Sequence, residues 1–192
     1  MKHKSVDRRD FIKITGVGVG GMILTSSCSH SGGKWRFFSD DEALCVAAIT
    51  EQIIPADEDA GAGEANVINY IDKQLSGFFA GYQQTYRRGI LGVQQTSTLM
   101  FGNKFETLAW EKQTDILKSL ESGNAQGDIW KHDSSQTFFE LIRDHTMQGF
   151  YGSPRHGGNK RYVSFKMIGI DYPRIYGQNR YQVFPGTFKP LK

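Results

Sequence analysis

The sequence predicts an all-α protein: a single domain of about five helices, orthogonal or bundle-like in their packing, under a loop-rich C-terminal cap. Apolar residues recur at helical spacing in five stretches between residues 39 and 148. The alternation of strands and helices that marks an α/β fold is missing, and the sequence has no internal repeat. The 192-residue chain is long enough for one domain with one hydrophobic core.

The first two helices are predicted from their ends and their apolar faces. Ser39 precedes Glu42 by three residues, the spacing of a capping box, and Pro55 ends the apolar pattern that follows. A second helix is expected over residues 64–79. Its apolar face comprises Val67, Ile68, Ile71, Leu75 and Phe78.

Three further helices are expected over residues 82–98, 110–121 and 135–148. The first of them contains Gly89 and Gly92, which weaken the helix prediction. The last contains Phe138, Phe139, Leu141, Ile142 and Met147. From residue 149 to residue 192 the chain is rich in Gly, Pro, Tyr and Phe, which predicts an ordered cap with buried aromatic side chains.

Residues 1–28 have the architecture of a twin-arginine export signal. Paired Arg8 and Arg9 are followed by Phe11 and Lys13, and a weakly apolar, glycine-containing run extends to residue 24. That run is too short for a stable membrane span. The alternative is an amphipathic N-terminal helix of a cytosolic protein, but the segment has no clear apolar stripe. We therefore expect an exported, periplasmic protein.

The small residues before Cys28 resemble a lipoprotein cleavage site, which would make Cys28 a lipidated, membrane-anchored N-terminus. An ordinary cysteine near a peptidase site is the alternative. Residues 29–36 are expected to form a flexible tether, and residues 37–192 the helical domain.

The charge of the chain gives no sign of nucleic-acid binding. Residues 1–27 hold five of the 23 basic and two of the 20 acidic residues, so the remainder has 18 of each and is neutral. Cys45 lies in an apolar helical stretch and is expected to be a small core residue rather than a nucleophile.

Two groups of residues are candidates for chemistry. Asp57, Glu58 and Asp59 form an acidic cluster that is either a solvated turn or a metal or partner contact. His145 and His156, with Asp144 nearby, flank an expected turn over residues 149–152 and are either metal ligands, an acid–base pair or structural residues. No motif assigns a catalytic, metal-binding or cofactor-binding residue, and we predict none in this chain.

The densest internal motif surrounds a Ser-Pro and a Gly-Gly-Asn sequence, each of which demands a turn. Such a loop is either a rigid surface presented to a partner or a difficult chain reversal under the cap. The candidate partner-binding residues are Tyr151, Gly152, Pro154, His156, Gly157, Gly158 and Asn159.

Two blocks of the chain match a known family pattern. The first runs from Phe38 to Asp72 and includes Ile53-Ile54-Pro55 before the acidic loop. The second comprises Gly149-Phe150-Tyr151-Gly152, Pro154, Gly157-Gly158-Asn159, Lys166 and Ile168-Gly169. Together they resemble the gluconate 2-dehydrogenase subunit 3 family. Ser153, His156 and Phe165 depart from the family pattern, which bears on the identity of the partner rather than on membership.

This resemblance implies a non-catalytic small subunit of a periplasmic flavin-dependent sugar or polyol dehydrogenase. The implied partners are a large subunit that holds FAD and, in some complexes, a multihaem cytochrome c. The twin-arginine machinery moves folded cargo, so one signal is expected to export both subunits and to assist the folding and stability of the flavoprotein.

Two other functions remain open from the sequence alone. The first is a stand-alone exported lipoprotein that binds a metal or small sugar, either between residues 57 and 64 or at His145 and His156. The second is an enzyme in its own right, with one of those histidines as the base.

Overall fold

A computed structural model describes residues 34–169, 175–176 and 180–181 of the chain. These ranges contain six α-helices: α2 (Asp40–Ile53), α3 (Val67–Leu75), α4 (Gln83–Phe101), α5 (Trp110–Glu121), α6 (Ser135–Tyr151) and α7 (Val163–Met167). Two-residue strands β1 (Ile175–Tyr176) and β2 (Arg180–Tyr181) pair in antiparallel fashion. The predicted all-α fold is confirmed. The export signal and Cys28 lie outside the described residues.

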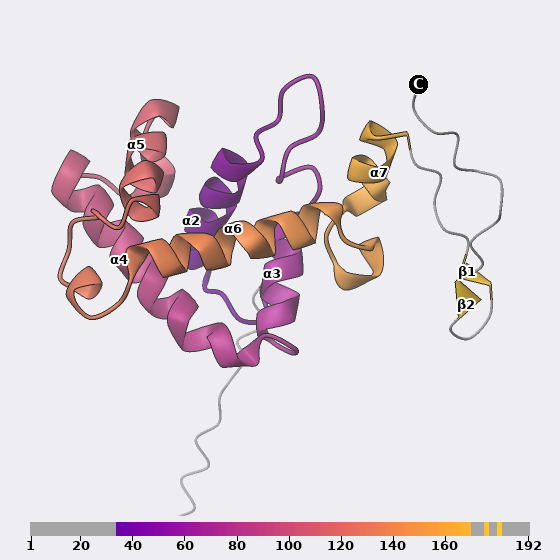
Figure 1. Cartoon of the computed structure of the whole chain (residues 1–192), viewed down its shortest axis with the longest axis horizontal. Coiled ribbons are helices and arrows are strands. Elements are labelled where there is room, and N and C mark those ends of the chain that lie inside the picture. The colour runs from indigo at the N-terminus through magenta and orange to yellow at the C-terminus, as the bar shows by residue number, and fades with distance from the viewer. Residues whose placement is uncertain (1–33, 170–174, 177–179, 182–192) are drawn as a thin grey trace, which may run out of the picture. The chain divides into compact units, whose positions relative to one another are not determined.

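Helix α6 is the central element of the helical domain and contacts α2, α3, α4 and α5 (Figure 1). The residues that it buries recur at helical spacing, among them Phe138, Ile142 and Phe150. Tyr86, Phe105 and Ile49 join them in the core from α4, a 3-10 turn and α2. Within the described residues no helix is both long enough and apolar enough to cross a membrane.

Helix α2 begins as the sequence predicts. The Ser39 hydroxyl accepts a hydrogen bond from the Glu42 backbone, and the Glu42 carboxylate accepts one from the Ser39 backbone. The capping box is therefore confirmed, and the helix ends just before Pro55. Cys45 is fully buried within it, and burial raises the pKa of its thiol, which suits the predicted core role.

Helix α3 is shorter than predicted at both ends. Residues 62–66 form a turn in which Asn66 has a left-handed backbone with φ of 58°, so the helix starts at Val67 instead of residue 64. The helix ends at Leu75, so Phe78 lies beyond it and is not on its buried face. The prediction for Phe78 is wrong, because its side chain is 88% exposed.

Helix α4 passes through both glycines without interruption and continues to Phe101. A methyl group on Gly89 would overlap the ring of Phe138, and one on Gly92 would overlap the indole of Trp130. The indole N–H of Trp130 donates to the hydroxyl of Thr96 at 2.9 Å. These glycines therefore allow close packing of neighbouring elements against α4.

Helix α5 has the predicted bounds, whereas α6 is longer than expected and continues to Tyr151. The turn predicted over residues 149–152 is wrong, since Gly149 is helical and lies against the ring of Tyr70. Met147 is 43% exposed and faces outward. The predicted loop-rich cap comprises 3-10 turns and the short helix α7 as far as residue 169.

Candidate functional site

The loop after α6 contains most of the predicted partner-binding residues. It is formed by 3-10 turns at Pro154–His156 and Lys160–Tyr162. Gly157 has φ of 106°, and Asn159, Arg161 and Tyr162 also have positive φ angles, of 42°, 58° and 61°. So many left-handed residues cost conformational free energy, which the surrounding contacts must offset.

Asn159 closes this loop onto the end of α6. Its backbone N–H donates to the Gly149 carbonyl at 2.9 Å, and its side-chain amide donates to the Gly152 carbonyl at 2.9 Å. The side-chain oxygen accepts from the backbone of Ser164 at 3.1 Å. Gly158 lies so close to the Gly149 carbonyl that a methyl group has no room. The Gly-Gly-Asn motif is thus a tight chain reversal.

The same loop is fastened to α3. The Asn69 side chain donates to the Gly157 carbonyl at 2.7 Å, and the Lys73 ammonium donates to the Arg155 carbonyl at 3.0 Å. Further back, the Lys160 backbone N–H donates to the Ala65 carbonyl at 3.0 Å. The loop is therefore held at two points by α3 and at a third by the turn just before α3, all about 90 residues earlier in the chain.

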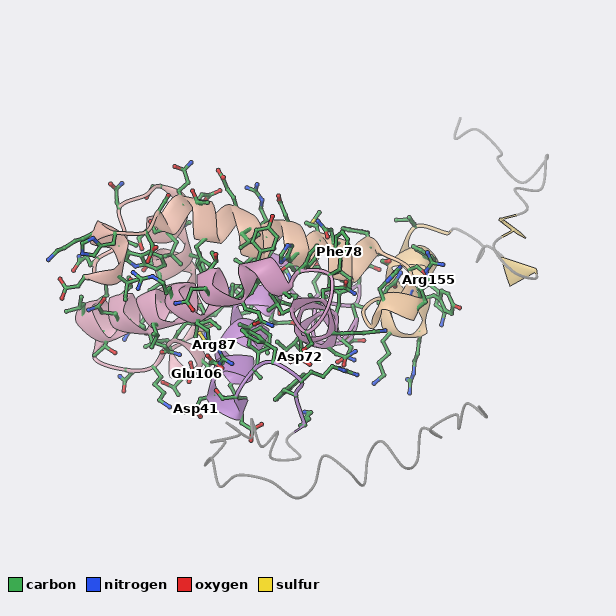
Figure 2. All side chains as sticks on the ribbon, turned by 90° about the horizontal axis from the view of Figure 1, so that it is seen from below. Asp41, Asp72, Phe78, Arg87, Glu106 and Arg155 are labelled. Atoms are coloured by element: carbon green, nitrogen blue, oxygen red, sulfur yellow. The ribbon has the colours of Figure 1, made fainter. Side chains whose placement is uncertain are left out.

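The structure divides the seven predicted partner-binding residues into two groups. Gly158 and Asn159 are buried, and with the partly buried Gly152, Pro154 and Gly157 they define the backbone path. Tyr151, 42% exposed, and His156 face outward. Arg155 lies at the same outer surface (Figure 2), and its Nε donates to Nε2 of His156 at 3.0 Å. The buried residues therefore form the predicted chain reversal, and Tyr151 and His156 stay candidates for the predicted partner contact.

His145 has a different environment from His156. Its ring stacks on Phe79 at 4.3 Å between centroids and on Tyr86 at 5.8 Å, and its Nδ1 is hydrogen-bonded to the Tyr86 hydroxyl at 2.9 Å. Burial lowers the pKa of His145 to about 4, although the nearby Asp144 carboxylate opposes this shift. His145 is therefore neutral near pH 7, and its contacts are those of a core residue.

The acidic loop has the contacts of a structural turn. The Glu51 carboxylate accepts from the backbone of Ala56 at 3.0 Å and of Gly63 at 2.7 Å, which closes the loop. Asp57 accepts from the Asp59 backbone at 2.8 Å. Residues 34–169 contain no group of three or more His, Cys, Asp or Glu side chains placed to hold a metal ion.

The surface of residues 34–169 has hollows that include the following two. One, of about 490 Å³, is lined by Trp35, Leu44, Ala47, Ile68 and their neighbours. The other, of about 330 Å³, lies beside Arg88, Trp130 and Asp133. Neither includes residues 57–64, His145 or His156, the positions considered for a metal or sugar ligand.

Asp72 is a structurally important residue that the sequence analysis did not single out. Its carboxylate is fully buried and accepts from the backbone N–H groups of Arg36, Phe37 and Phe38 at 2.9 to 3.2 Å. This contact fixes the segment before α2 on α3. An aspartate inside the otherwise apolar face of the second helix was the available signal, because a buried carboxylate requires donors.

The fold and the loop define a small all-α domain whose most constrained surface segment follows its central helix. Residues 40–171 match the family Gluconate 2-dehydrogenase subunit 3, and the chain belongs to this family. No curated protein and no solved structure matches the chain. The matched range includes α2 to α7 and the whole loop, so the family resemblance seen in the sequence is confirmed.

Proposed function

We propose that this chain is the non-catalytic small subunit of a periplasmic, flavin-dependent sugar or polyol dehydrogenase complex. Membership of the subunit 3 family over residues 40–171 is the observation on which this proposal depends, because a subunit of such a complex implies a catalytic partner. The partner is expected to hold FAD, and a multihaem cytochrome c would be the third component of a three-subunit complex.

The rigid loop supports this proposal as a contact surface. Its backbone is fixed by Asn159, by the helix α3 side chains and by the close approach of Gly158 to Gly149. Binding therefore need not order this segment, which removes one of the entropic costs of association. Tyr151, Arg155 and His156 supply the exposed aromatic and polar groups that protein interfaces favour.

The proposed export role follows from the N-terminal sequence. Arg8 and Arg9 would direct the chain to the twin-arginine machinery, and Cys28 would anchor it to a membrane after cleavage. A flavoprotein must fold around its cofactor before export, and the twin-arginine route accepts folded proteins. In this proposal the small subunit binds, stabilises and escorts the flavoprotein.

Purification of the full chain from its own cells tests the proposal. The chain, tagged at its C-terminus, is isolated from detergent-solubilised membranes. We expect a protein with bound flavin and with sugar or polyol dehydrogenase activity to co-purify in stoichiometric amount. A chain that elutes alone, without flavin absorbance, would contradict the proposal. Metal analysis of the same sample tests the alternative of a metal-binding lipoprotein.

A further inference from the structure

The connection between α3 and α4 is an exposed, uncharged and aromatic surface. We call residues 76–85 the aromatic corner. Eight of its ten residues are exposed, and none of the ten is charged. Phe78 is 88% exposed and Tyr82 is 45% exposed. Figure 2 shows Phe78 at the end of α3. The rings of Phe78, Phe79 and Tyr82 are neighbours, and contiguous exposed apolar surface rimmed by polar residues marks interaction sites.

The aromatic corner is rigid. Backbone N–H groups of Phe79, Ala80 and Tyr82 donate to the carbonyls of Gln74, Gly77 and Phe79 at 2.7 to 3.1 Å. The Gln83 side chain donates to the Leu75 carbonyl at 2.8 Å. The ring of Phe79 stacks on buried His145 and meets the ring of Phe78 at 5.4 Å between centroids. Phe78 is thus held out from the domain by a well-packed neighbour.

We propose that the aromatic corner is an anchoring contact for the catalytic flavoprotein, with Phe78 as its central residue. This inference rests on the proposed function, which supplies the partner. Binding hot spots are enriched in aromatic residues, and interface cores are depleted of charge. The corner has both properties, and its preformed backbone lowers the cost of association.

The position of the aromatic corner is compatible with a single interface that also includes the loop after α6. The loop is bonded to Asn69 and Lys73 on α3, and the corner begins at the C-terminal end of the same nine-residue helix. Such a helix is roughly 14 Å long. A standard interface of about 800 Å² per partner covers that span.

The test compares Phe78→Ser with Leu91→Ser in the full-length chain. Leu91 is 61% exposed on α4 and lies outside the corner, so it controls for loss of an exposed apolar side chain. Both changes are at the surface, and thermal unfolding should show that both variants remain folded. Retention of the flavoprotein is measured by flavin absorbance and dehydrogenase activity at a series of dilutions.

We expect Phe78→Ser to weaken retention about ten-fold or more, and Leu91→Ser to leave it unchanged. Equal retention by Phe78→Ser and wild type would overturn the inference and leave the proposed function intact. Equal loss in both variants would also overturn it, because the corner would have no special part. Failure of the wild-type chain to retain any flavoprotein would instead overturn the proposed function. A chain that dimerises through Phe78 on its own would assign the corner to a second copy and overturn the inference as well.

Discussion

Asp72 links two segments of the chain that the sequence places far apart. Three backbone N–H groups stabilise its buried carboxylate. The exposed Arg36 guanidinium also lies 3.4 Å from the Asp72 carboxylate. Hydrogen bonds to a charged acceptor are stronger than neutral ones, and removal of the acceptor leaves the donors buried without a partner.

We expect Asp72→Ala to reduce the free energy of unfolding by about 3 kcal/mol, because three backbone donors lose their acceptor. Urea unfolding followed by circular dichroism measures the change. Asp57→Ala is the control, since Asp57 is exposed and accepts only one local hydrogen bond. Equal unfolding midpoints for the two variants would show that the Asp72 contacts are energetically unimportant.

His145 predicts a pH dependence of stability. Its pKa is lowered from 6.5 to about 4 in the folded chain, so the unfolded chain binds the extra proton first as the pH falls. The contribution of this residue is fully present above pH 6.5 and is lost progressively as the pH falls from 6.5 toward 4. Melting temperatures should therefore decrease over this range.

The His145→Phe variant should show a smaller decrease, because phenylalanine does not titrate. It should also be less stable near pH 7, since the Tyr86 hydroxyl loses its partner. His156→Ala, at an exposed position, should keep the wild-type slope. If His145→Phe has the same slope as wild type, other groups cause the acid sensitivity.

At the scale of the helices, Gly89 in α4 gives a prediction about stability. Helix propensity and side-chain packing predict opposite signs for the change in the free energy of unfolding. Helix propensity alone predicts that Gly89→Ala stabilises the chain by up to about 1 kcal/mol. The structure predicts the opposite, a loss of about 1 to 3 kcal/mol, because the new methyl group overlaps the ring of Phe138. Gly81→Ala is the matched control, since no atom lies within 4 Å of the added methyl group. A more stable Gly89→Ala variant would mean that the packing adapts.

The loop gives a second prediction at this scale. Gly158→Ala should displace the Gly-Gly-Asn reversal, because the new methyl group would overlap the Gly149 carbonyl. This carbonyl belongs to the backbone and cannot rotate away as a flexible side chain could. If the loop is a contact surface, retention of the flavoprotein should fall while the domain stays folded. Gly169→Ala is unsuitable as a control because Gly169 has φ of 67°, so the control is Leu91→Ser on α4, which lies outside both the loop and the aromatic corner. Unchanged retention would exclude the loop from the interface.

These elements also show which features local sequence predicts. Helices α2 and α5 were predicted well because caps and apolar spacing are local properties. By local rules Gly89 weakens a helix and Gly149 indicates a turn, yet both lie inside helices. Their partners, Phe138 and Tyr70, are distant in sequence, so no local pattern reports the packing. Asp72 differs, because its place on the apolar face of α3 was a local signal and only its donors, Arg36, Phe37 and Phe38, are distant in sequence.

The tight loop after α6 was predicted from the sequence, but the burial of its individual residues was not. The sequence identified the segment around Gly157 and Asn159, because positive φ angles have a compositional signature. It did not show that Asn159 is buried while His156 is exposed. Phe78 was assigned to the core because helical spacing was extended beyond the end of α3 at Leu75.

At the scale of the whole protein, the export signal gives a prediction about two chains. Replacement of Arg8 and Arg9 by lysine should retain both this chain and the flavoprotein in the cytoplasm, because the proposed escort no longer engages the export machinery. Dehydrogenase activity in periplasmic and cytoplasmic fractions measures the effect. The control replaces Lys2 and Lys4 by arginine. Normal periplasmic activity in the first variant would show that the flavoprotein travels independently.

The buried Asp72 contact also defines where the domain can be shortened. Its hydrogen-bond donors begin at Arg36, four residues before the first residue of α2. A recombinant chain that starts at the helix cap, Ser39, would keep every helix yet leave a buried carboxylate without its three donors. A chain that starts at Lys34 would keep them. The N-terminal limit of the folded domain is therefore set by the Asp72 side chain on α3 and not by the start of α2.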